Sequence, residues 1–315
     1  MDHRDKTRAI CALIQQVRWA VYVAHVREYR TIVSDNRRWE HFVHRPGDVF
    51  VCTPSKCGTT WMQTIVNTLM FPDGAPGPVM VMAPWLDARF DPVEVLLERL
   101  DAQTHRRALK THTPADGIPW FPDASYITVN RDGRDVFMSM YNHMRTMRQD
   151  VTTDLAMSAA REGIDLGSRG LPNVDDEHAF FPWWLENAGL LEHVASFWER
   201  RGEPNLLFVH YDDMTIDLEG EMRRVAAFLA IEIDEAKLPG MVERCTFAGM
   251  KARPDDIGPF ERRFVGGAES FLYKGTNGRW RDVMTDAELD AYQARVAEML
   301  PPDAAVWLAG RSAIG

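Results

Sequence analysis

The feature that most constrains this chain is a repeated alternation of short apolar runs with longer segments of helical periodicity. The apolar runs are Asp48–Thr53, Ser125–Asn130 and Asn205–Tyr211, with Arg106–Thr111 as a weaker fourth candidate. Strands that alternate with helices form parallel sheets covered on both faces, because each helix carries the chain back to start the next strand in the same direction. We therefore predict an α/β fold with a central, mainly parallel sheet, flanked by helices and P-loop-like in architecture. The helical patterns follow the first three runs, at Thr59–Met70, Arg134–Arg148 and Glu219–Leu229.

The composition is that of a globular protein. The 315 residues are 45% hydrophobic and 26% charged, and a chain of this length can bury a large core. No linker-like stretch divides it, so we expect one domain over residues 1–315 with a helical extension at residues 1–30. The formal net charge of −10 argues against a general nucleic-acid binder, which needs excess positive charge. A polyanionic ligand would require a local concentration of donors.

The N-terminal extension contains a fairly apolar stretch, Ala9–Val26, interrupted by Gln15, Gln16, Arg18 and His25. It is too polar to span a bilayer, so we expect an amphipathic helix that packs on the protein body, with peripheral membrane contact as the alternative. No secretory signal is visible and no two cysteines have Cys-x-x-Cys spacing, so we expect reduced thiols in the cytoplasm and no zinc site. The cysteines are Cys11, Cys52, Cys57 and Cys245.

Two segments break the alternation of strands and helices. Residues 72–92 contain five prolines, and residues 150–182 have only weak periodicity. We expect both to be long ordered loops, either walls of a ligand site or plain surface excursions.

The sharpest candidate site is the turn Thr53–Trp61, where a buried strand leads into a helix. Gly58 lets backbone N–H groups approach an anion, and the helix N-terminus adds partial positive charge. Lys56 adds a full charge, and Thr59 and Thr60 can donate hydroxyl groups. The pattern differs from the Walker A motif because the lysine precedes the glycine. The turn predicts a phosphate cradle, with an ordinary capped helix start as the alternative.

Three further sites carry donors or a base. Arg131 follows the strand Ser125–Asn130, and Ser139 in the next helix could join it on one anionic group, although a salt bridge between Asp135 and Arg131 or Arg134 is equally compatible. His112 ends the segment Lys110-Thr111-His112, and histidine is the side chain best suited to accept a proton near neutral pH. A loop near the C-terminal end of the chain, called the late loop below, could close over a phosphate group, with a solvated surface turn as the alternative. Its residues are Lys274, Gly275, Gly278, Arg279 and Arg281.

Together these motifs resemble the cytosolic-type sulfotransferases, which use 3′-phosphoadenosine-5′-phosphosulfate as donor, and a bacterial member of that family is implied. Residues 56–61 resemble the family's Lys-Ser-Gly-Thr-Thr-Trp phosphosulfate loop, and residues 110–112 its Lys-Thr-His segment. Arg131 and Ser139 match its 3′-phosphate site, and Lys274-Gly275 its late glycine-rich loop. The order of the motifs holds from about Arg45 to Thr285. The resemblance implies nucleotide contacts from Lys56, Cys57, Gly58, Thr59, Thr60, Trp61, Arg131, Ser139, Tyr211, Thr246, Phe247, Lys274 and Gly275, with Trp61, Tyr211 and Phe247 around the adenine.

The resemblance further implies an enzyme that transfers a sulfuryl group in line to a hydroxyl or amine of a small or lipid-like acceptor. His112 would be the general base, Lys56 and Lys110 would stabilise the leaving phosphate, adenosine 3′,5′-bisphosphate would be the product, and no metal would be required. A P-loop nucleotide kinase and a non-catalytic nucleotide-binding member remain as alternatives.

The chain departs from the family pattern at several positions. Cys57 replaces a serine in the phosphosulfate loop. Two alternatives follow for this cysteine: it is a reactive thiolate at a helix N-terminus, or it is an inert buried residue. Tyr273 replaces the arginine that usually binds the 3′-phosphate. The family's dimerisation motif is only partly present around Thr285, so the oligomeric state stays open.

Overall fold

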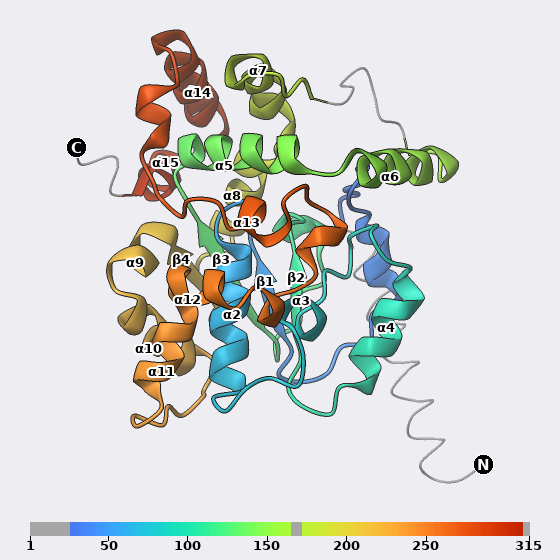
Figure 1. Ribbon diagram of the computed structural model, residues 1–315, viewed down its shortest axis with the longest axis vertical. Coiled ribbons are helices and arrows are strands. Elements are labelled where there is room, and N and C mark those ends of the chain that lie inside the picture. The colour runs from blue at the N-terminus through green and yellow to red at the C-terminus, as the bar shows by residue number, and fades with distance from the viewer. Residues whose placement is uncertain (1–25, 165–171, 311–315) are drawn as a thin grey trace.

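A computed structural model describes residues 26–164 and 172–310 of the chain (Figure 1). Its centre is a four-stranded parallel sheet with the strand order β2-β1-β3-β4. The predicted α/β fold, with a parallel sheet flanked by helices, is confirmed. The strands are β1 (Val49–Cys52), β2 (Ala108–Thr111), β3 (Ser125–Asn130) and β4 (Leu206–His210).

The strand order places a switch point between β1 and β3. The chain passes from β1 to its neighbour β2 and then crosses to β3 on the opposite side of β1. In open parallel sheets such a reversal leaves a crevice outside the carboxyl ends of the two central strands, and ligands bind there. The turn after β1 and the segment after β3 therefore meet at this crevice.

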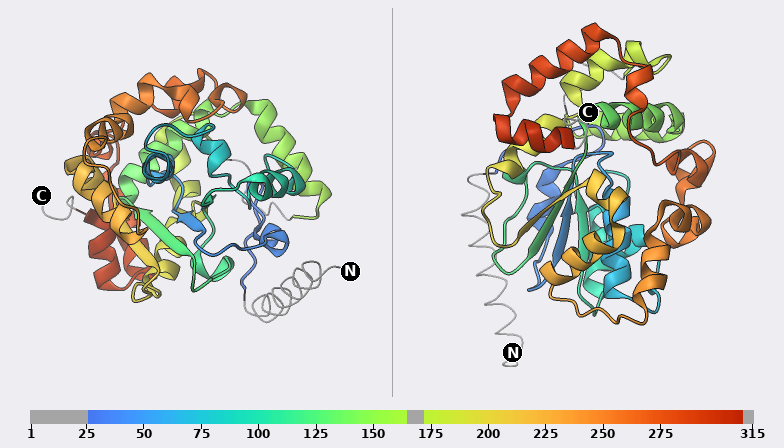
Figure 2. Two further views of the ribbon diagram at one scale, coloured as in Figure 1. Left: turned by 90° about the horizontal axis from the view of Figure 1, so that it is seen from below. Right: turned by 90° about the vertical axis from the view of Figure 1, so that its left-hand side faces the viewer.

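Helices cover both faces of the sheet and one end of it (Figures 1 and 2). The α-helices before β4 are α2 (Thr59–Met70), α3 (Val79–Met82), α4 (Val93–Ala102), α5 (Gly133–Thr146), α6 (Gln149–Arg161), α7 (Glu177–Asn187) and α8 (Leu190–Trp198). Those after β4 are α9 (Tyr211–Ile216), α10 (Leu218–Phe228), α11 (Leu238–Cys245), α12 (Phe247–Ala252), α13 (Gly267–Phe271), α14 (Asp286–Met299) and α15 (Pro302–Ala309). Short 3-10 helices are η1 (Asn36–His41), η2 (Ala115–Gly117), η3 (Pro254–Asp256), η4 (Phe260–Arg262) and η5 (Arg279–Asp282).

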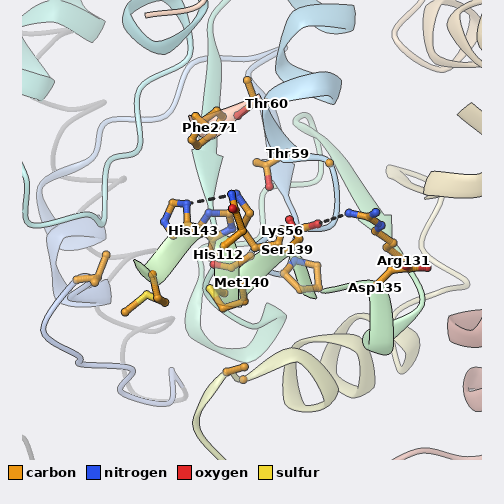
Figure 3. Close-up of a pocket in the computed structure, with 18 of the residues that line it drawn as sticks. Lys56, Thr59, Thr60, His112, Arg131, Asp135, Ser139, Met140, His143 and Phe271 are labelled. Carbon is orange, nitrogen blue, oxygen red and sulfur yellow. Dashed lines mark hydrogen bonds between the residues drawn. The ribbon is translucent and has the colours of Figure 1, made fainter. Parts of the chain in front are cut away.

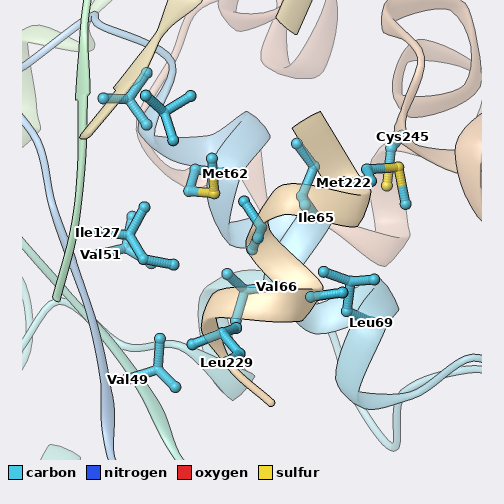
Figure 4. Close-up of a cluster of buried hydrophobic side chains, with 14 of the residues drawn as sticks. Val49, Val51, Met62, Ile65, Val66, Leu69, Ile127, Met222, Leu229 and Cys245 are labelled. Atoms are coloured by element: carbon cyan, nitrogen blue, oxygen red, sulfur yellow. The ribbon is translucent and has the colours of Figure 1, made fainter. Parts of the chain in front are cut away.

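Alternation along β1 explains why both faces are covered. Val49 and Val51 point into a core with α2, α10 and α11, and Phe50 and Cys52 point into a second core on the other face. All four side chains are fully buried, as expected for a central strand of a parallel sheet. Helix α2 meets the first core with a stripe of residues spaced three or four apart, Met62, Ile65, Val66 and Leu69 (Figure 4).

A third core joins α5, α7, α8, α14 and α15. In Figure 1, α5, α7 and α14 lie together at one end of the molecule. Phe137 of α5 anchors this core against Phe181 of α7, with ring centroids 5.4 Å apart in an edge-on arrangement. The core holds α5 rigidly beside the crevice, so that the opposite face of α5 can present side chains to it.

The structure corrects several sequence-based expectations. Residues 149–161 form helix α6 and residues 177–187 form α7, so the segment 150–182 is largely helical in its described part rather than a loop. The segment 72–92 contains the short helix α3, and β4 is followed directly by α9 before the predicted helix α10 begins. Helix α6 buries only Leu155 and Ala159, and this small number of buried apolar residues explains why sequence patterns missed it.

The predicted amphipathic N-terminal helix lies almost entirely outside the described residues. Within residues 26–164 and 172–310, no helix is both long enough and apolar enough to cross a membrane.

Candidate active site

A cavity of about 1000 Å³ lies at the carboxyl ends of the strands (Figure 3). Its walls come from the turns after β1, β2 and β3, from α5, and from the segment around residues 270–279. The catalytic and nucleotide-contacting residues that the resemblance implies all line this cavity, with the exception of Cys57, whereas Gly278 and Arg281 of the late loop do not. The cavity thus brings together residues that lie more than 200 positions apart in the chain, such as Lys56 and Lys274.

The turn after β1 is shaped to leave backbone N–H groups facing the cavity. Lys56 and Gly58 both have left-handed backbone conformations, with φ of 69° and 102°. A Cβ atom at Gly58 would also lie 3.0 Å from the Tyr211 ring, so both the backbone conformation and the close contact favour glycine at this position. The first turn of α2 leaves its N–H groups without helical acceptors, and the Thr59 hydroxyl is already hydrogen-bonded to that of Thr53. This arrangement is an anion-binding helix start.

Lys56 projects from this turn toward helix α5. Its Nζ lies 3.3 Å from Nδ1 of His143 and 4.6 Å from the centroid of the Phe271 ring. Burial, together with the positive charge of Arg131, lowers the pKa of Lys56 to about 8. Sequence reasoning missed His143, which follows Ser139 by one helical turn and so shares its face of α5.

His112 is oriented by the backbone of β1. Its Nδ1 lies 2.6 Å from the carbonyl oxygen of Thr53. A carbonyl oxygen can only accept a hydrogen bond, so Nδ1 carries the proton and Nε2 presents a lone pair. Burial, and next the charge of Lys110, holds the pKa of His112 well below its usual range, so the ring is neutral at physiological pH.

Lys110 lies beside His112, and Trp85 contacts both. The Lys110 ammonium is 4.4 Å from the centroid of the Trp85 ring, and the His112 ring meets the same indole edge-on at 4.6 Å. Burial, with the charges of Arg263 and Lys56, lowers the pKa of Lys110 to about 7. The floor of the cavity is therefore cationic but poorly solvated, and it favours an anionic ligand.

A fully buried carboxylate, Asp87, supports this strand end from behind. It accepts hydrogen bonds from the hydroxyls of Thr111 and Thr113, both at 2.6 Å, and from Nε1 of Trp39 at 3.1 Å. These contacts hold the residues on either side of His112. The local sequence around Asp87 carries no motif, so its place behind the site could not be read from the sequence.

Arg131 leaves the end of β3 and connects to the late loop. Its guanidinium donates to Oδ1 of Asn277 at 2.6 and 3.0 Å and lies 4.2 Å from the centroid of the Tyr211 ring. Asn277 in turn donates to Asp212 at 2.6 Å, and the N–H of Gly278 donates to Asp135 at 2.7 Å. The proposed ion pair of Asp135 with Arg131 or Arg134 is not formed, because Arg134 pairs with Asp132 at 2.6 Å instead.

Aromatic rings occupy the side of the cavity next to α2 and α12. Trp61 and Tyr211 meet edge-on with their centroids 5.2 Å apart, and Nε1 of Trp61 donates to the carbonyl of Cys245 at 2.7 Å. Phe247 packs against the late loop so closely that a Cβ at Gly275 would lie 2.6 Å from its ring. Gly275 also has a positive φ of 64°, so both its conformation and its contact exclude other side chains.

Cys57 departs from the expectation of a nucleotide-contacting residue. Its side chain is fully buried in the core of α5 and α7 and does not line the cavity. Burial raises the pKa of the thiol to about 12, against the thiolate that the helix N-terminus alone would favour. The burial of the thiol therefore favours the inert alternative.

Methionines form another part of the cavity wall. Met140, Met144 and Met147 line it together with Phe90 and Trp183. Thioether side chains are apolar and adaptable, so this wall suits a flexible or irregular apolar group. The same cavity is lined by polar residues, namely Arg27, Arg30, Glu186, Asn187 and Glu192. Among the described residues, no cluster of three or more His, Cys, Asp or Glu side chains could hold a metal ion.

An anion-binding turn at the switch point of a parallel sheet, with aromatic rings beside it, is typical of nucleotide-binding α/β proteins. A family model narrows this class: the model described as "Sulfotransferase domain" matches residues 46–301. The chain therefore belongs to the sulfotransferase family, in agreement with the motifs in its sequence.

Relatives of known activity agree with this assignment. A protein of Mycobacterium bovis (strain BCG / Pasteur 1173P2) described as a glycolipid sulfotransferase is 33% identical over 309 residues, which cover 89% of this chain and 93% of that protein. A glycolipid sulfotransferase of Mycobacterium tuberculosis (strain ATCC 25177 / H37Ra) is also 33% identical, over 303 residues. Among solved structures, mouse sulfotransferase SULT7A1 complexed with PAP has the same fold, with a TM-score of 0.67, 19% identity and coverage of 88% of this chain and 92% of that one.

Proposed function

We propose that this protein transfers a sulfuryl group from 3′-phosphoadenosine-5′-phosphosulfate to a hydroxyl group of an amphipathic, glycolipid-like acceptor, with His112 as the general base. One observation carries this proposal: His112, Lys56, Trp61 and Tyr211 all line the same cavity. His112 offers a lone pair on Nε2 and Lys56 an ammonium group, and the other two residues offer aromatic rings. A base, a cation and a nucleotide-sized aromatic site in one cavity are the requirements of this reaction.

The donor would lie along the switch point of the sheet. The turn of Lys56 and Gly58 would bind the 5′-phosphosulfate, because it combines a cation with a helix N-terminus. Arg131 and Ser139 line the same cavity and would bind the 3′-phosphate, and Trp61, Tyr211 and Phe247 would surround the adenine. Lys274 and Gly275 would complete the site from the late loop, with Thr246 beside the nucleoside.

In the proposed reaction the acceptor oxygen attacks the sulfur while the bond from sulfur to the phosphate oxygen breaks. The acceptor's proton passes to Nε2 of His112, so the oxygen is not left as a cationic ester. Lys56, Lys110 and the hydroxyl of Thr59 stabilise the negative charge that grows on the leaving phosphate. The products are the sulfate ester and adenosine 3′,5′-bisphosphate, and atoms and charge balance.

The acceptor proposal rests on the cavity and on the relatives. Ligand cavities typically have volumes of about 300–1,000 Å³, so a cavity of about 1000 Å³ has room for a donor and an acceptor together. Its methionine wall suits a lipid-like chain, and the polar residues Glu186 and Asn187 suit a sugar. Two relatives are described as glycolipid sulfotransferases.

The test is transfer from the donor to a graded set of acceptors, followed by mass spectrometry of the sulfated product. We expect a long-chain alkyl glucoside to be sulfated and free glucose to react far more slowly, because glucose leaves the methionine wall unfilled. Equal rates for both would contradict the glycolipid-like acceptor. Transfer should persist in excess EDTA, whereas phosphate transfer from ATP with a strict Mg²⁺ requirement would favour the kinase alternative. Binding of the nucleotide without turnover of any acceptor would favour a non-catalytic member.

A further inference from the structure

His143 faces the cavity from α5 and contacts the lysine of the phosphate turn (Figure 3). Its ring lies against Phe264 and Phe271, with centroid distances of 4.9 and 6.0 Å. These rings fix the plane of the imidazole, so that Nδ1 is held 3.3 Å from Nζ of Lys56. The reaction proposed above assigns no role to this histidine.

The direction of the hydrogen bond follows from the donor inventory of the two groups. A lysine ammonium has three N–H donors and no acceptor, so Nδ1 of His143 must accept and the ring must be neutral. Its surroundings keep it neutral: burial, and then the positive charge of Lys56, holds the pKa of His143 well below its usual range.

The other titratable groups that act electrostatically on this pair are basic side chains, of which His112 is neutral. Lys110 and His112 act from the end of β2, Arg131 from the end of β3, and Arg263 from the segment after η4. A buried ammonium in such surroundings tends to lose its proton. A neutral imidazole that accepts a hydrogen bond from it works against that tendency without adding a negative charge that would repel an anionic donor.

We propose that His143 is a positioning residue for Lys56: its Nδ1 accepts a hydrogen bond from the lysine, aims the ammonium into the cavity and favours its protonated form. The identity of the anion that Lys56 meets rests on the proposed function. The contact between Lys56 and His143 is independent of the proposed function, because it lies within the protein.

Two variants of His143 separate this role from simple packing. His143→Phe keeps a ring between Phe264 and Phe271 but removes the acceptor, and His143→Leu takes its place if the phenylalanine variant folds poorly. His143→Asn removes most of the ring but restores an acceptor at the position of Nδ1. His193→Phe is the matched control, because His193 is also a buried, neutral histidine, stacked on Phe197 with centroids 4.6 Å apart.

The first measurement needs no ligand. Trace acylation of the native protein as a function of pH, with the Lys56 peptide quantified by mass spectrometry, reports the titration of this amine. We expect a midpoint near pH 8 in the parent protein. The midpoint should fall in His143→Phe, because the ammonium loses its acceptor, and should stay near the parental value in His143→Asn and His193→Phe. An unchanged midpoint in His143→Phe, or an equal fall in His143→Asn, would overturn the proposal.

The second measurement is the affinity for adenosine 3′,5′-bisphosphate by titration calorimetry over the same pH range. The protonated lysine binds the anion, so affinity should fall as the pH rises through the midpoint of Lys56. In His143→Phe we expect this fall at lower pH, with affinity near the parental midpoint weaker by roughly three- to tenfold. If the Lys56 titration shifts but affinity has no pH dependence in this range, the assignment of Lys56 to the donor is wrong, while the role of His143 stands.

Discussion

His112 and Lys56 are assigned different parts of the reaction, so their removal should have different consequences. His112→Ala should lower turnover by roughly 10²-fold or more, the usual size of general-base catalysis. The affinity for adenosine 3′,5′-bisphosphate should hardly change, because the ring is hydrogen-bonded to the Thr53 backbone and has no assigned phosphate contact. Lys56→Ala should lower both turnover and this affinity, because it removes charge from the bound donor and from the leaving group.

Steady-state rates with a slow acceptor, combined with calorimetry of the nucleotide, measure these two effects. Parental turnover in His112→Ala across neutral and alkaline pH would show that another group handles the acceptor's proton. Nucleotide affinity that falls equally in both variants would show that His112 contacts the donor.

Cys57 should be inert in the folded protein. Its side chain is fully buried, and burial raises the pKa of the thiol to about 12, so almost no thiolate exists at neutral pH. We expect iodoacetamide to leave Cys57 unmodified in the native protein and to alkylate it after unfolding, as read by peptide mass spectrometry. Rapid alkylation in the native state, slowed by nucleotide, would instead indicate that the loop opens and exposes the thiol.

Single residues differ in how far a sequence can place them. Lys56, Gly58 and His112 lie beside strand ends, and because parallel strands end at one edge of the sheet, their meeting could be predicted. His143 could have been found from its spacing of four after Ser139, which puts both on one helical face. Asp87 carries no such signal, because its contacts with Thr111 and Thr113 depend on how a loop folds behind the sheet.

At the scale of elements, α5 and the late loop are joined through one carboxylate. Asp135 in the first turn of α5 accepts the N–H of Gly278. Burial is the largest influence on this carboxyl and raises its pKa from 3.8 to about 6. The protonated form is thus favoured in the folded state, so ionisation between these two pH values destabilises the native protein relative to the unfolded chain.

Asp135→Asn keeps an acceptor for Gly278 but cannot ionise. The difference in unfolding free energy between Asp135→Asn and the parent should therefore rise as the pH increases from 3.8 to about 6 and stay level above that. The full change should be about 3 kcal/mol. Denaturant unfolding at several pH values measures it. A difference that does not vary with pH in this interval would show that Asp135 titrates normally.

The helices that follow the three clearest apolar runs were predicted, and several helices outside that alternation were not. Helix α2 begins and ends where the pattern indicates, because four of its apolar residues face one core. Helix α6 buries only two residues, so its stability depends more on local helix propensity than on an apolar stripe. The apolar run Asn205–Tyr211 includes the first residue of helix α9, because Tyr211 both ends that run and begins the helix, and the rest of α9 was not predicted.

At the scale of the whole molecule, charge is distributed unevenly. The chain carries a formal net charge of −10, yet the cavity floor presents Lys56, Lys110 and Arg131. Burial and neighbouring positive charges lower the pKa values of Lys56 and Lys110, so these cations are crowded and poorly hydrated. An anionic nucleotide would relieve this repulsion, so ligand binding and the stability of the whole fold should be coupled.

This coupling predicts that adenosine 3′,5′-bisphosphate raises the melting temperature of the protein more than AMP does at equal concentration. Both nucleotides can fill the adenine site and the phosphate turn, but only the bisphosphate can reach Arg131 and Ser139 with a 3′-phosphate. Ligand stabilisation grows with the logarithm of concentration over dissociation constant, so a contact that strengthens binding ten- to a hundredfold should add roughly 2–5 °C to the shift. Differential scanning fluorimetry measures the shifts, and in Arg131→Gln the advantage of the bisphosphate should shrink while the response to AMP is largely kept. Equal shifts for the two nucleotides in the parent protein would show that Arg131 and Ser139 do not form the 3′-phosphate site, and the donor would then have to lie differently across the switch point of the sheet.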